Sequence, residues 1–386
     1  MPPSRSQSIV PPSYPTARTA AARIYDHFAR HLSAARQQGA EVAEGPDVAT
    51  IELIIETAFW ASLRREEGYM PQISLAFVAP QAVEWPLMFG RSLPFAAEPV
   101  TRLAPAVERP GIHLGVWRVE GQLSVWGATR RLPPSCFVLE VVAPGLLVVK
   151  HSRGGESEKF VNVAVLQGDQ VKVIDEASAR SLDCPDLLRF LLGLDNQDAN
   201  TESANPLIHL AISMRGHGRG GSLLVVPAGS ELWRESLAQP VLYDVVPPFS
   251  ILAELLRDQP PGKQGQGWTE AFRRAVDTVA GLTAVDGATV MTDNYEVLAF
   301  GAKIVRRPGF SQVSALNVTE PIEGAVAKVV DPGQLGGTRH LSAAQFVNDQ
   351  RDSIALIASQ DGRFTVFAWS PCESMVHAHR IEALLL

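Results

Sequence analysis

The sequence contains few cysteines, and these are not spaced for disulfide or metal chemistry. There are three in 386 residues, at Cys136, Cys184 and Cys372. An odd number of widely separated cysteines without a CxxC pair provides neither a disulfide framework nor a zinc site. The pattern therefore predicts reduced thiols in a cytoplasmic protein, where their role is burial.

Excess positive charge and long apolar runs are also lacking. The net charge of −7 argues against broad attraction to nucleic acid or to an anionic membrane surface. No window reaches the roughly 18 uncharged apolar residues that span a bilayer. Residues 1–15, rich in Pro and Ser, lack the apolar core of a signal peptide and are interpreted as a flexible leader. We therefore expect a soluble protein with neither nucleic acid nor membrane among its partners.

The composition is that of a globular protein, with 46% hydrophobic and 19% charged residues. A chain of 386 residues exceeds the usual size of a single core, so two domains are expected. Apolar spacing predicts helices at 16–38 and at 51–63, the second ended by Gly68. Strand patterns follow at 73–79, 112–119, 122–128, 136–142, 146–151, 160–166 and 171–174. Residues 16–195 are thus predicted to form a mostly β, α+β domain, with Trp117 and Trp126 in its core; a ligand-binding aromatic pair is the less favoured alternative.

A short helix is predicted at 187–194. The polar run at 196–205 is suited to a linker, and it places the second domain at 206–386. Helix and strand patterns alternate there, which predicts an α/β domain: a mixed sheet layered by helices. Residues 306–324 are expected to form a surface loop, and the tail from Trp369 a terminal helix. The helices are predicted at 206–215, 249–256 and 268–282, and the strands at 222–226, 288–292, 295–304, 325–330, 353–359 and 363–369.

The stretch GGTRHLSAA at 336–344 allows two interpretations. It fits an ordinary loop and helix start, with Thr338 as the cap and Arg339 and His340 in solvent. It also fits a phosphate-binding turn, in which glycine amides, a helix N-terminus and two basic side chains hold an anion.

A second glycine-rich stretch, GHGRGG at 216–221, is not a P-loop. It lacks the Lys-Ser/Thr pair and precedes a strand rather than a helix, so we interpret it as the exit from a helix. His209, His217, His377 and His379 show no metal-ligand spacing and are expected to be structural or exposed.

Asp286-Gly287-Ala288 is a common turn sequence by itself. Considered together with the turn at 336–340 and Ser359, it indicates a ligand site. All three segments are predicted to lie where a strand meets a loop in one α/β domain, and ligands bind beyond strand ends in such domains.

Together, VDGATVMTDNYEVLAFGA, GGTRHLSAA and IALIASQDGRFTVF resemble the DisA-type diadenylate cyclase domain. Its hallmarks are an Asp-Gly-Ala motif, a Gly-Thr-Arg-His-Arg motif and a following Ser-Glu-Glu turn. The similarity covers about residues 205–370, and the N-terminal part is similar to the sensor-like domains that precede some of these cyclase domains in bacteria. The resemblance implies condensation of two ATP into cyclic di-AMP with release of pyrophosphate, assisted by Mg²⁺ or Mn²⁺.

The resemblance also implies roles for individual residues. Asp286 would hold the metal and orient or deprotonate the attacking hydroxyl, while Arg339 and His340 would neutralise the triphosphate. The nucleotide-binding residues would be Gly287 and Ala288 as a small floor, Gly337 and Thr338 as a phosphate cradle, and Ser359 and Gln360 in the neighbouring turn.

Each ATP is both attacker and target in this reaction, so a face-to-face homodimer, at least transient, is expected. The sequence departs from the family pattern at Leu341, at Gln360 and at Val285, where an Arg, a Glu and often a His would stand. Two functions therefore remain: a cyclase gated by the N-terminal domain, or a nucleotide or cyclic-dinucleotide sensor of the same fold with weakened catalysis. A scaffold that binds no nucleotide is the third and least favoured.

Overall fold

The computed structural model describes residues 13–37, 42–152, 160–175, 205–258 and 266–386. The chain divides into two compact units, Met1–Ile174 and Asp175–Leu386. Most of the predicted leader, the predicted linker except Asn205, a short helix expected at 187–194 and Cys184 lie outside the described residues. Each unit is described by itself below.

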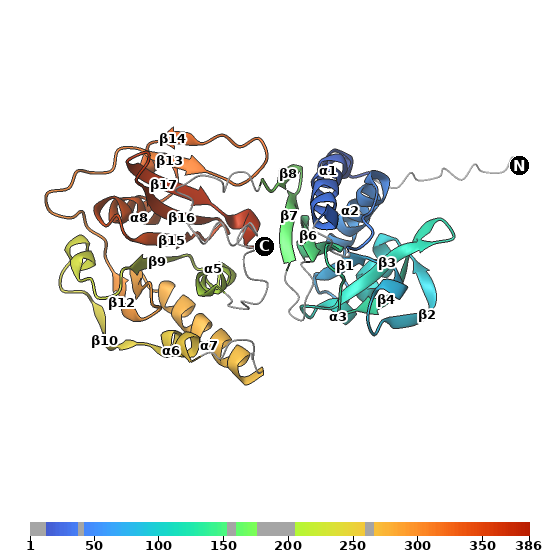
Figure 1. Ribbon diagram of the computed structural model, residues 1–386, viewed down its shortest axis with the longest axis horizontal. Helices are drawn as coiled ribbons and strands as arrows, with labels where there is room; N and C mark the ends of the chain where they lie inside the picture. Colours follow the sequence, from blue (N-terminus) through green and yellow to red (C-terminus); the bar gives the residue numbers. More distant parts are fainter. Residues whose placement is uncertain (1–12, 38–41, 153–159, 176–204, 259–265) are drawn as a thin grey trace, which may run out of the picture. The chain divides into compact units, whose positions relative to one another are not determined.

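The first unit contains one mixed sheet with three helices (Figure 1). Its strands lie in the order β2-β4-β3-β1-β5-β6-β7-β8. β1 and β3 are parallel, and the other neighbours are antiparallel. The helices are α1 (Pro15–Gln37), α2 (Val48–Ser62) and α3 (Ala97–Val107), and the strands are β1 (Ile73–Phe77), β2 (Leu87–Pro94), β3 (His113–Val119), β4 (Gln122–Thr129), β5 (Phe137–Ala143), β6 (Leu146–Ser152), β7 (Phe160–Gln167) and β8 (Gln170–Val173).

This arrangement confirms the predicted α+β unit and its hairpins. The apolar face of α1 is buried, as the spacing of Ile24, Phe28 and Leu32 indicates. Trp126 is buried, and its indole Nε1 donates to the Val78 carbonyl across 2.8 Å, so the core interpretation holds. The structure adds β2 and α3, which the sequence pattern did not reveal. It also ends α2 at Ser62 rather than at Gly68.

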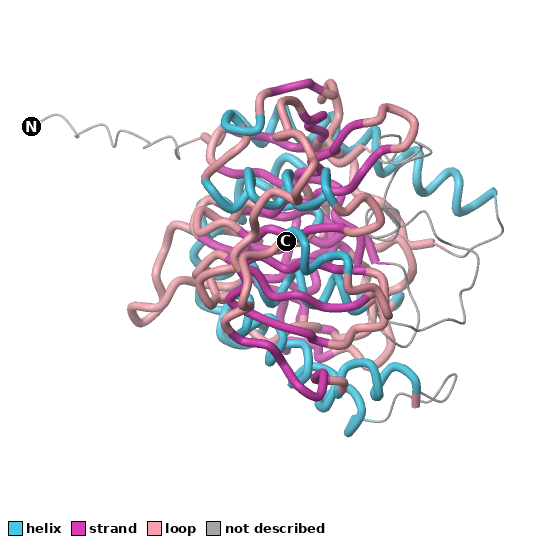
Figure 2. Tube along the Cα trace, turned by 90° about the vertical axis from the view of Figure 1, so that its left-hand side faces the viewer, coloured by secondary structure: helices cyan, strands magenta, loops and turns pink. Residues whose placement is uncertain are grey.

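The second unit is built on a nine-stranded sheet, in the order β10-β12-β11-β9-β15-β16-β17-β13-β14. Figure 2 shows its strands side by side (magenta). Its helices are α5 (Pro206–Gly216), α6 (Ile251–Arg257), α7 (Gln266–Thr283) and α8 (Thr338–Asp349). Its strands are β9 (Gly221–Val226), β10 (Tyr243–Phe249), β11 (Ala288–Thr292), β12 (Val297–Ala302), β13 (Leu316–Thr319), β14 (Lys328–Val330), β15 (Ile354–Ala358), β16 (Phe364–Ser370) and β17 (Met375–Arg380).

Helices cover both faces of this sheet, which confirms the predicted layered α/β architecture. Leu224 and Val226 of β9 lie in one core with Phe346 and Val347 of α8. The alternate residues of β9 point to the opposite face, where α5 and α7 pack. α5 begins as predicted, because the Asn205 side chain accepts a hydrogen bond from the Leu207 amide.

Two expectations for the second unit are wrong. The presumed surface loop at 306–324 contains β13, whose Leu316 is fully buried, because this strand extends the sheet beside β17. The tail from Trp369 is not a helix. It completes β16, forms β17 and ends in a short 3-10 turn, since Val376 and Ala378 alternate into the core beneath α8.

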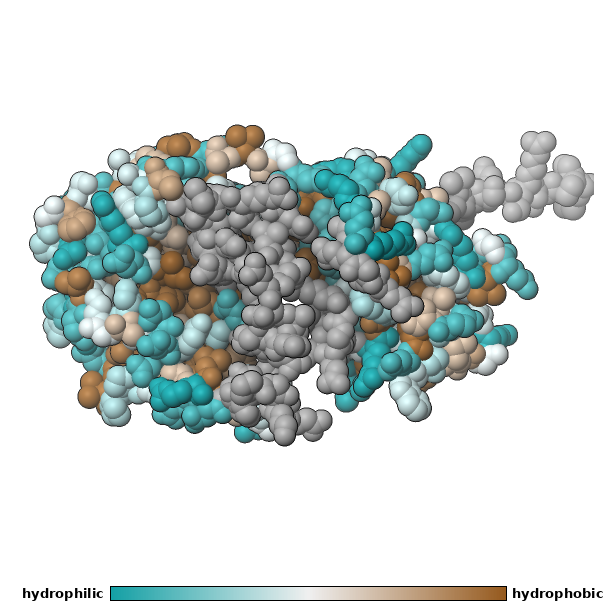
Figure 3. Space-filling view, in the orientation of Figure 1, coloured by the Kyte–Doolittle hydropathy of each residue, from teal (hydrophilic) through white to brown (hydrophobic). Residues whose placement is uncertain are grey.

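The surface agrees with the balanced composition. In Figure 3 polar residues cover most of the visible face of each unit, and apolar residues lie in separate small groups. Cys136 is buried as expected, whereas Cys372 is exposed because it lies in the turn after β16. Within the described ranges no helix has both the length and the apolar character needed to cross a membrane.

Candidate functional site

The predicted site segments meet at one end of the nine-stranded sheet. β9 and β11 are parallel and both begin at this end, while β15 runs the opposite way and finishes there. In the register, Gly221 pairs with Ala358, and Ala288 pairs with Ala302. Asp286, Ser359 and the glycine-rich exit from α5 therefore lie at the ends of neighbouring strands although they are distant in sequence.

Asp286 precedes β11 in the sequence, and its carboxylate is paired with Lys303, the residue that directly follows β12. The Lys303 ammonium donates to Oδ2 of Asp286 across 2.6 Å. This hydrogen bond, together with the charge of Lys303, lowers the pKa of Asp286, and the charge of Arg339 acts in the same direction. The Asp286 side chain is 91% exposed, so this ionised carboxylate is open to solvent and ligands.

Gly287 and Ala288 are required by the fold around Asp286. Gly287 has φ +116°, and a Cβ there would lie 2.4 Å from the Gly301 carbonyl carbon. Only glycine fits this left-handed position against neighbouring backbone. Ala288 is buried in the core shared with α8. The small residues thus keep β11 and β12 close together directly below Asp286.

The predicted phosphate turn is the N-terminus of α8. Gly337 is the N-cap residue and makes no side-chain cap, so the interpretation of Thr338 as the cap is wrong. A Cβ on Gly337 would meet no atom within 4 Å, and Thr338 is exposed. The first amide groups of a helix lack partners within that helix and attract anions. This end of α8 is therefore open to an anionic group.

Arg339 reaches across the sheet end to the exit from α5. A Cβ on Gly220 would lie 2.8 Å from Nη1 of Arg339. Gly220, with φ +73°, thus leaves the space that the guanidinium occupies. The Arg339 side chain makes no hydrogen bond or ion pair with any residue in the described parts of the chain, yet its charge acts on Asp286. A cation and an anion from distant motifs thus face the same region.

His340 has a different environment from the solvent position expected of it. It is buried, and burial lowers its pKa, aided by the charges of Arg380, Arg363 and Arg339 and opposed by Asp361. A neutral ring contributes hydrogen bonds rather than positive charge at neutral pH. The charges that act on His340 come from three arginines, which therefore lie near one another at this end of the sheet.

Ser359 and Gln360 form the turn after β15. The pKa of Asp361 is lowered even though its slight burial would raise it, because the Ser359 hydroxyl and the Arg363 amide hydrogen-bond to its carboxylate. The Gln360 side-chain amide donates to the Arg219 carbonyl across 3.3 Å. Gln360 therefore ties this turn to the glycine-rich exit from α5.

The described residues contain no group of three or more His, Cys, Asp or Glu side chains that could hold a metal ion. Magnesium sites commonly use one or two carboxylates completed by water and substrate phosphates. Asp286 fits such a site only when a phosphate ligand is also present. His377 and His379 are structural, because they are buried and bonded to Glu373 and Thr319.

Sequence reasoning missed Lys303, Arg363 and Arg380. Lys303 follows β12, Arg363 precedes β16 and Arg380 ends β17. Arg380 pairs in register with Thr365, at the sheet end where Ala358 pairs with Phe364. Their positions at strand ends gain meaning only once the strand order is known, and no sequence pattern marked them beforehand.

The comparisons with known proteins bear on the first unit. No curated protein matches the chain. Residues 40–130, which include α2, α3 and β1 to β4, match the model of a family described as a probable sensor domain, DACNV. The match lies within the predicted N-terminal domain at 16–195 and supports a domain of the sensor type there.

Proposed function

We propose that the protein is a diadenylate cyclase whose C-terminal unit condenses two ATP into cyclic di-AMP under the control of the N-terminal sensor domain. The observation that carries this is the meeting of Asp286, Arg339 and the open N-terminus of α8 at one end of the sheet. Sensor domains of the matched family are typically linked to diadenylate cyclases, which supports the same activity.

In the proposed reaction the 3′-oxygen of one ATP attacks the α-phosphorus of the other. A phosphorus–oxygen bond forms, the bond to the β-phosphate breaks, and pyrophosphate leaves. Asp286 is suited to accept the hydroxyl proton or to orient the hydroxyl, because its carboxylate is ionised and exposed. Repetition with the roles exchanged closes the ring.

Arg339 and the amides at Gly337 and Thr338 supply the positive potential for the triphosphate. The Arg339 guanidinium has no ion pair among the described residues and can make charge-assisted hydrogen bonds to phosphate oxygens. The helix N-terminus adds oriented amide dipoles that need no rearrangement. Ser359 lies in the adjoining turn and completes the expected phosphate contacts.

A divalent ion, Mg²⁺ or Mn²⁺, would be held by Asp286 together with phosphate oxygens, and when bound it would supply charge that offsets the triphosphate. The Lys303 ammonium donates to the same carboxylate. The lysine must therefore move aside, or be retained as a phosphate contact, when nucleotide and metal bind.

Because one unit would hold one ATP, the proposed reaction needs two copies with opposed sites, which is the symmetry of a two-fold homodimer. The initial rate should then rise more steeply than in proportion to protein concentration at dilutions that separate the copies. A rate strictly proportional to protein across the monomer range would argue against opposed sites.

The direct test incubates the full chain with ATP and Mn²⁺ or Mg²⁺ and separates the products by chromatography. Cyclic di-AMP and pyrophosphate are expected from the natural chain. Asp286→Asn should reduce turnover by about 10² or more, the order of a lost acid–base or metal contact. Asp258→Asn, at the exposed end of α6, is the matched control and should leave turnover unchanged.

A second candidate function is a sensor that binds ATP or cyclic di-AMP without turning it over. The contact between Lys303 and Asp286 favours it, because a bound ammonium occupies the one carboxylate of the predicted motif. Tight nucleotide binding with no product over hours would support this function. If the chain neither binds ATP analogues nor shows a thermal shift with them, both candidate functions are excluded.

A further inference from the structure

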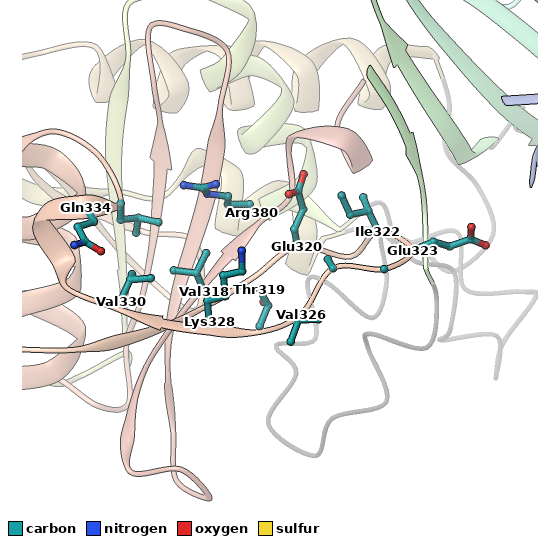
Figure 4. A pocket seen from close by; sticks show the side chains of 13 residues that line it. Val318, Thr319, Glu320, Ile322, Glu323, Val326, Lys328, Val330, Gln334 and Arg380 are labelled. Atoms are coloured by element: carbon teal, nitrogen blue, oxygen red, sulfur yellow. The ribbon is translucent and has the colours of Figure 1, made fainter. Parts of the chain in front are cut away.

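A pocket of about 470 Å³ lies next to the proposed nucleotide site but is built from other elements (Figure 4). Its walls come from β13, β14, the loop between them, the end of β17 and the residues before the turn at Gly336. None of the predicted site residues lines it. Its volume lies within the range of small-molecule sites in proteins, about 300–1,000 Å³.

Two cationic side chains line this pocket without a partner among the described residues. The side chains of Lys328, from β14, and Arg380, from β17, make no hydrogen bond or ion pair within the part of the chain that the structure describes. In Figure 4 the Lys328 amine points toward the side of the pocket where Arg380 lies. The two acidic residues of the lining, Glu320 and Glu323, already have interaction partners. Lys328 and Arg380 are therefore the lining groups that an anionic ligand can pair with.

The rest of the lining suits the body of an organic ligand. Val318, Val326 and Val330 provide apolar surface, and the side chains of Thr319 and Gln334 add hydrogen-bonding groups. A pocket with apolar walls and a few convergent polar groups typically orients a ligand that has an apolar body and one charged end.

The pocket is joined to the phosphate turn through the chain itself. Gln334 and Leu335 line it and directly precede Gly336 and Gly337. Arg380 also acts on His340, whose pKa it lowers, and a Cβ on Gly336 would lie 2.6 Å from Nδ1 of His340. A ligand that moves Arg380 or Leu335 therefore disturbs residues packed against the N-terminus of α8.

We propose that this pocket is a second binding site, for an organic phosphate of nucleoside-monophosphate size, and that its occupancy regulates the turn at 336–340. The phosphate lies between Lys328 and Arg380, and the organic body lies against the valines. The regulatory part rests on the proposed function, whereas the binding site itself does not.

The binding test is isothermal titration calorimetry of the full chain with AMP. Inorganic phosphate supplies the charge without the body, and adenosine supplies the body without the charge; both should bind at least tenfold more weakly than AMP. Lys328→Met and Arg380→Met should each weaken AMP binding at least tenfold. Arg257→Met, an exposed charge on α6, is the matched control and should change nothing. Because Lys328 is exposed, its replacement should leave the fold intact.

Arg339→Met separates this site from the proposed nucleotide site. AMP affinity that survives Arg339→Met and is lost in Lys328→Met supports the second site. Affinity lost in Arg339→Met and kept in Lys328→Met overturns it, as does absence of AMP binding at millimolar concentration in a folded chain. Inorganic phosphate binding as tightly as AMP also overturns it, because that marks only a charged surface.

The regulatory part is tested by titrating a non-hydrolysable ATP analogue with and without saturating AMP. The analogue's affinity should change at least threefold in the natural chain and should not change in Lys328→Met. Equal affinities in both conditions overturn the regulation. AMP binding with no cyclase activity would remove the proposed function and leave this site in place, so the two failures are distinguishable.

Discussion

The Lys303 ammonium donates to Oδ2 of Asp286 across 2.6 Å, and both side chains are largely exposed. The two residues come from adjoining strand ends, since Ala288 pairs with Ala302. The lysine thus occupies the carboxylate that the proposed reaction needs, and any metal or hydroxyl must compete with it.

Removal of this competition should tighten metal binding. Lys303→Met leaves Asp286 without its ammonium partner. The Mn²⁺ affinity in the presence of a non-hydrolysable ATP analogue should then rise by no more than about fivefold, because exposed ion pairs are weak. Electron paramagnetic resonance of free Mn²⁺ measures the change, with Arg257→Met as control. A weaker Mn²⁺ complex would show that Lys303 contacts phosphate instead.

Gly220 should control the position of Arg339. Gly220→Ala places a methyl group 2.8 Å from Nη1 of Arg339, so the guanidinium must shift and affinity for the ATP analogue should fall about tenfold, the effect of one charge-assisted hydrogen bond. Gly218→Ala also has positive φ but meets no atom within 4 Å, and it is the matched control. Equal losses in the two variants would mean that backbone strain, rather than Arg339, is responsible.

Gly287 should be a stability requirement independent of catalysis. Gly287→Ala combines φ +116° with contacts of 2.4 and 2.6 Å to the Gly301 carbonyl group, and the cost should exceed about 3 kcal/mol. Gly309→Ala has φ +82° in open space and should cost only about 1–2 kcal/mol. Urea unfolding of the full chain compares the two, and similar midpoints would contradict the close approach of β11 and β12.

His379 should make the protein less stable in acid. Burial lowers its pKa from 6.5 to about 3, so below pH 6.5 the unfolded chain binds a proton that the folded chain does not. The contribution of the neutral His379 to the free energy of unfolding is fully present above pH 6.5. It is lost as the pH falls toward 3, by at most about 1.4 kcal/mol per pH unit. In His379→Asn the urea unfolding midpoint should therefore depend less on pH between pH 4 and 6 than it does in the natural chain. If the slope of the urea midpoint against pH is the same in both chains, groups other than His379 cause the loss of stability in acid.

Much of the fold could be predicted from local sequence signals. The glycine turns at 120–121, 144–145 and 168–169 fixed the hairpins of the first unit, because residues there adopt positive φ. β10 was missed because it carries Pro247 and Pro248, which are atypical of strands and tolerated here at the sheet edge. β13 was missed because four residues are too few for a pattern.

The tail was misread for a different reason. In β17 both faces are buried, since His377 and His379 are buried as well as Val376 and Ala378. The tail was expected to be a helix, whereas the alternation of apolar residues and histidines over the six residues of β17 was the better signal. Hydrogen bonds to Glu373 and Thr319 make the buried histidines acceptable there.

The candidate site was predictable in part. Asp286 and Arg339 were recognised from motifs, and the structure brings their charges within reach of one another. Lys303 and Arg380 could not be recognised, because their relevance depends on which strand ends lie together. That order is set by pairing across the whole unit, which no local pattern records.

The sheet end is assembled from segments that begin at Gly220 and finish at Arg380. Since β17 is among the last strands of the chain, an incomplete unit lacks part of the cationic cluster. A nucleotide that binds there would bind only the fully folded unit. It would raise the free energy of unfolding of the whole unit by an amount that grows with the logarithm of ligand concentration. Resistance to proteolysis in the presence of ligand would then report that the last strand has joined the sheet.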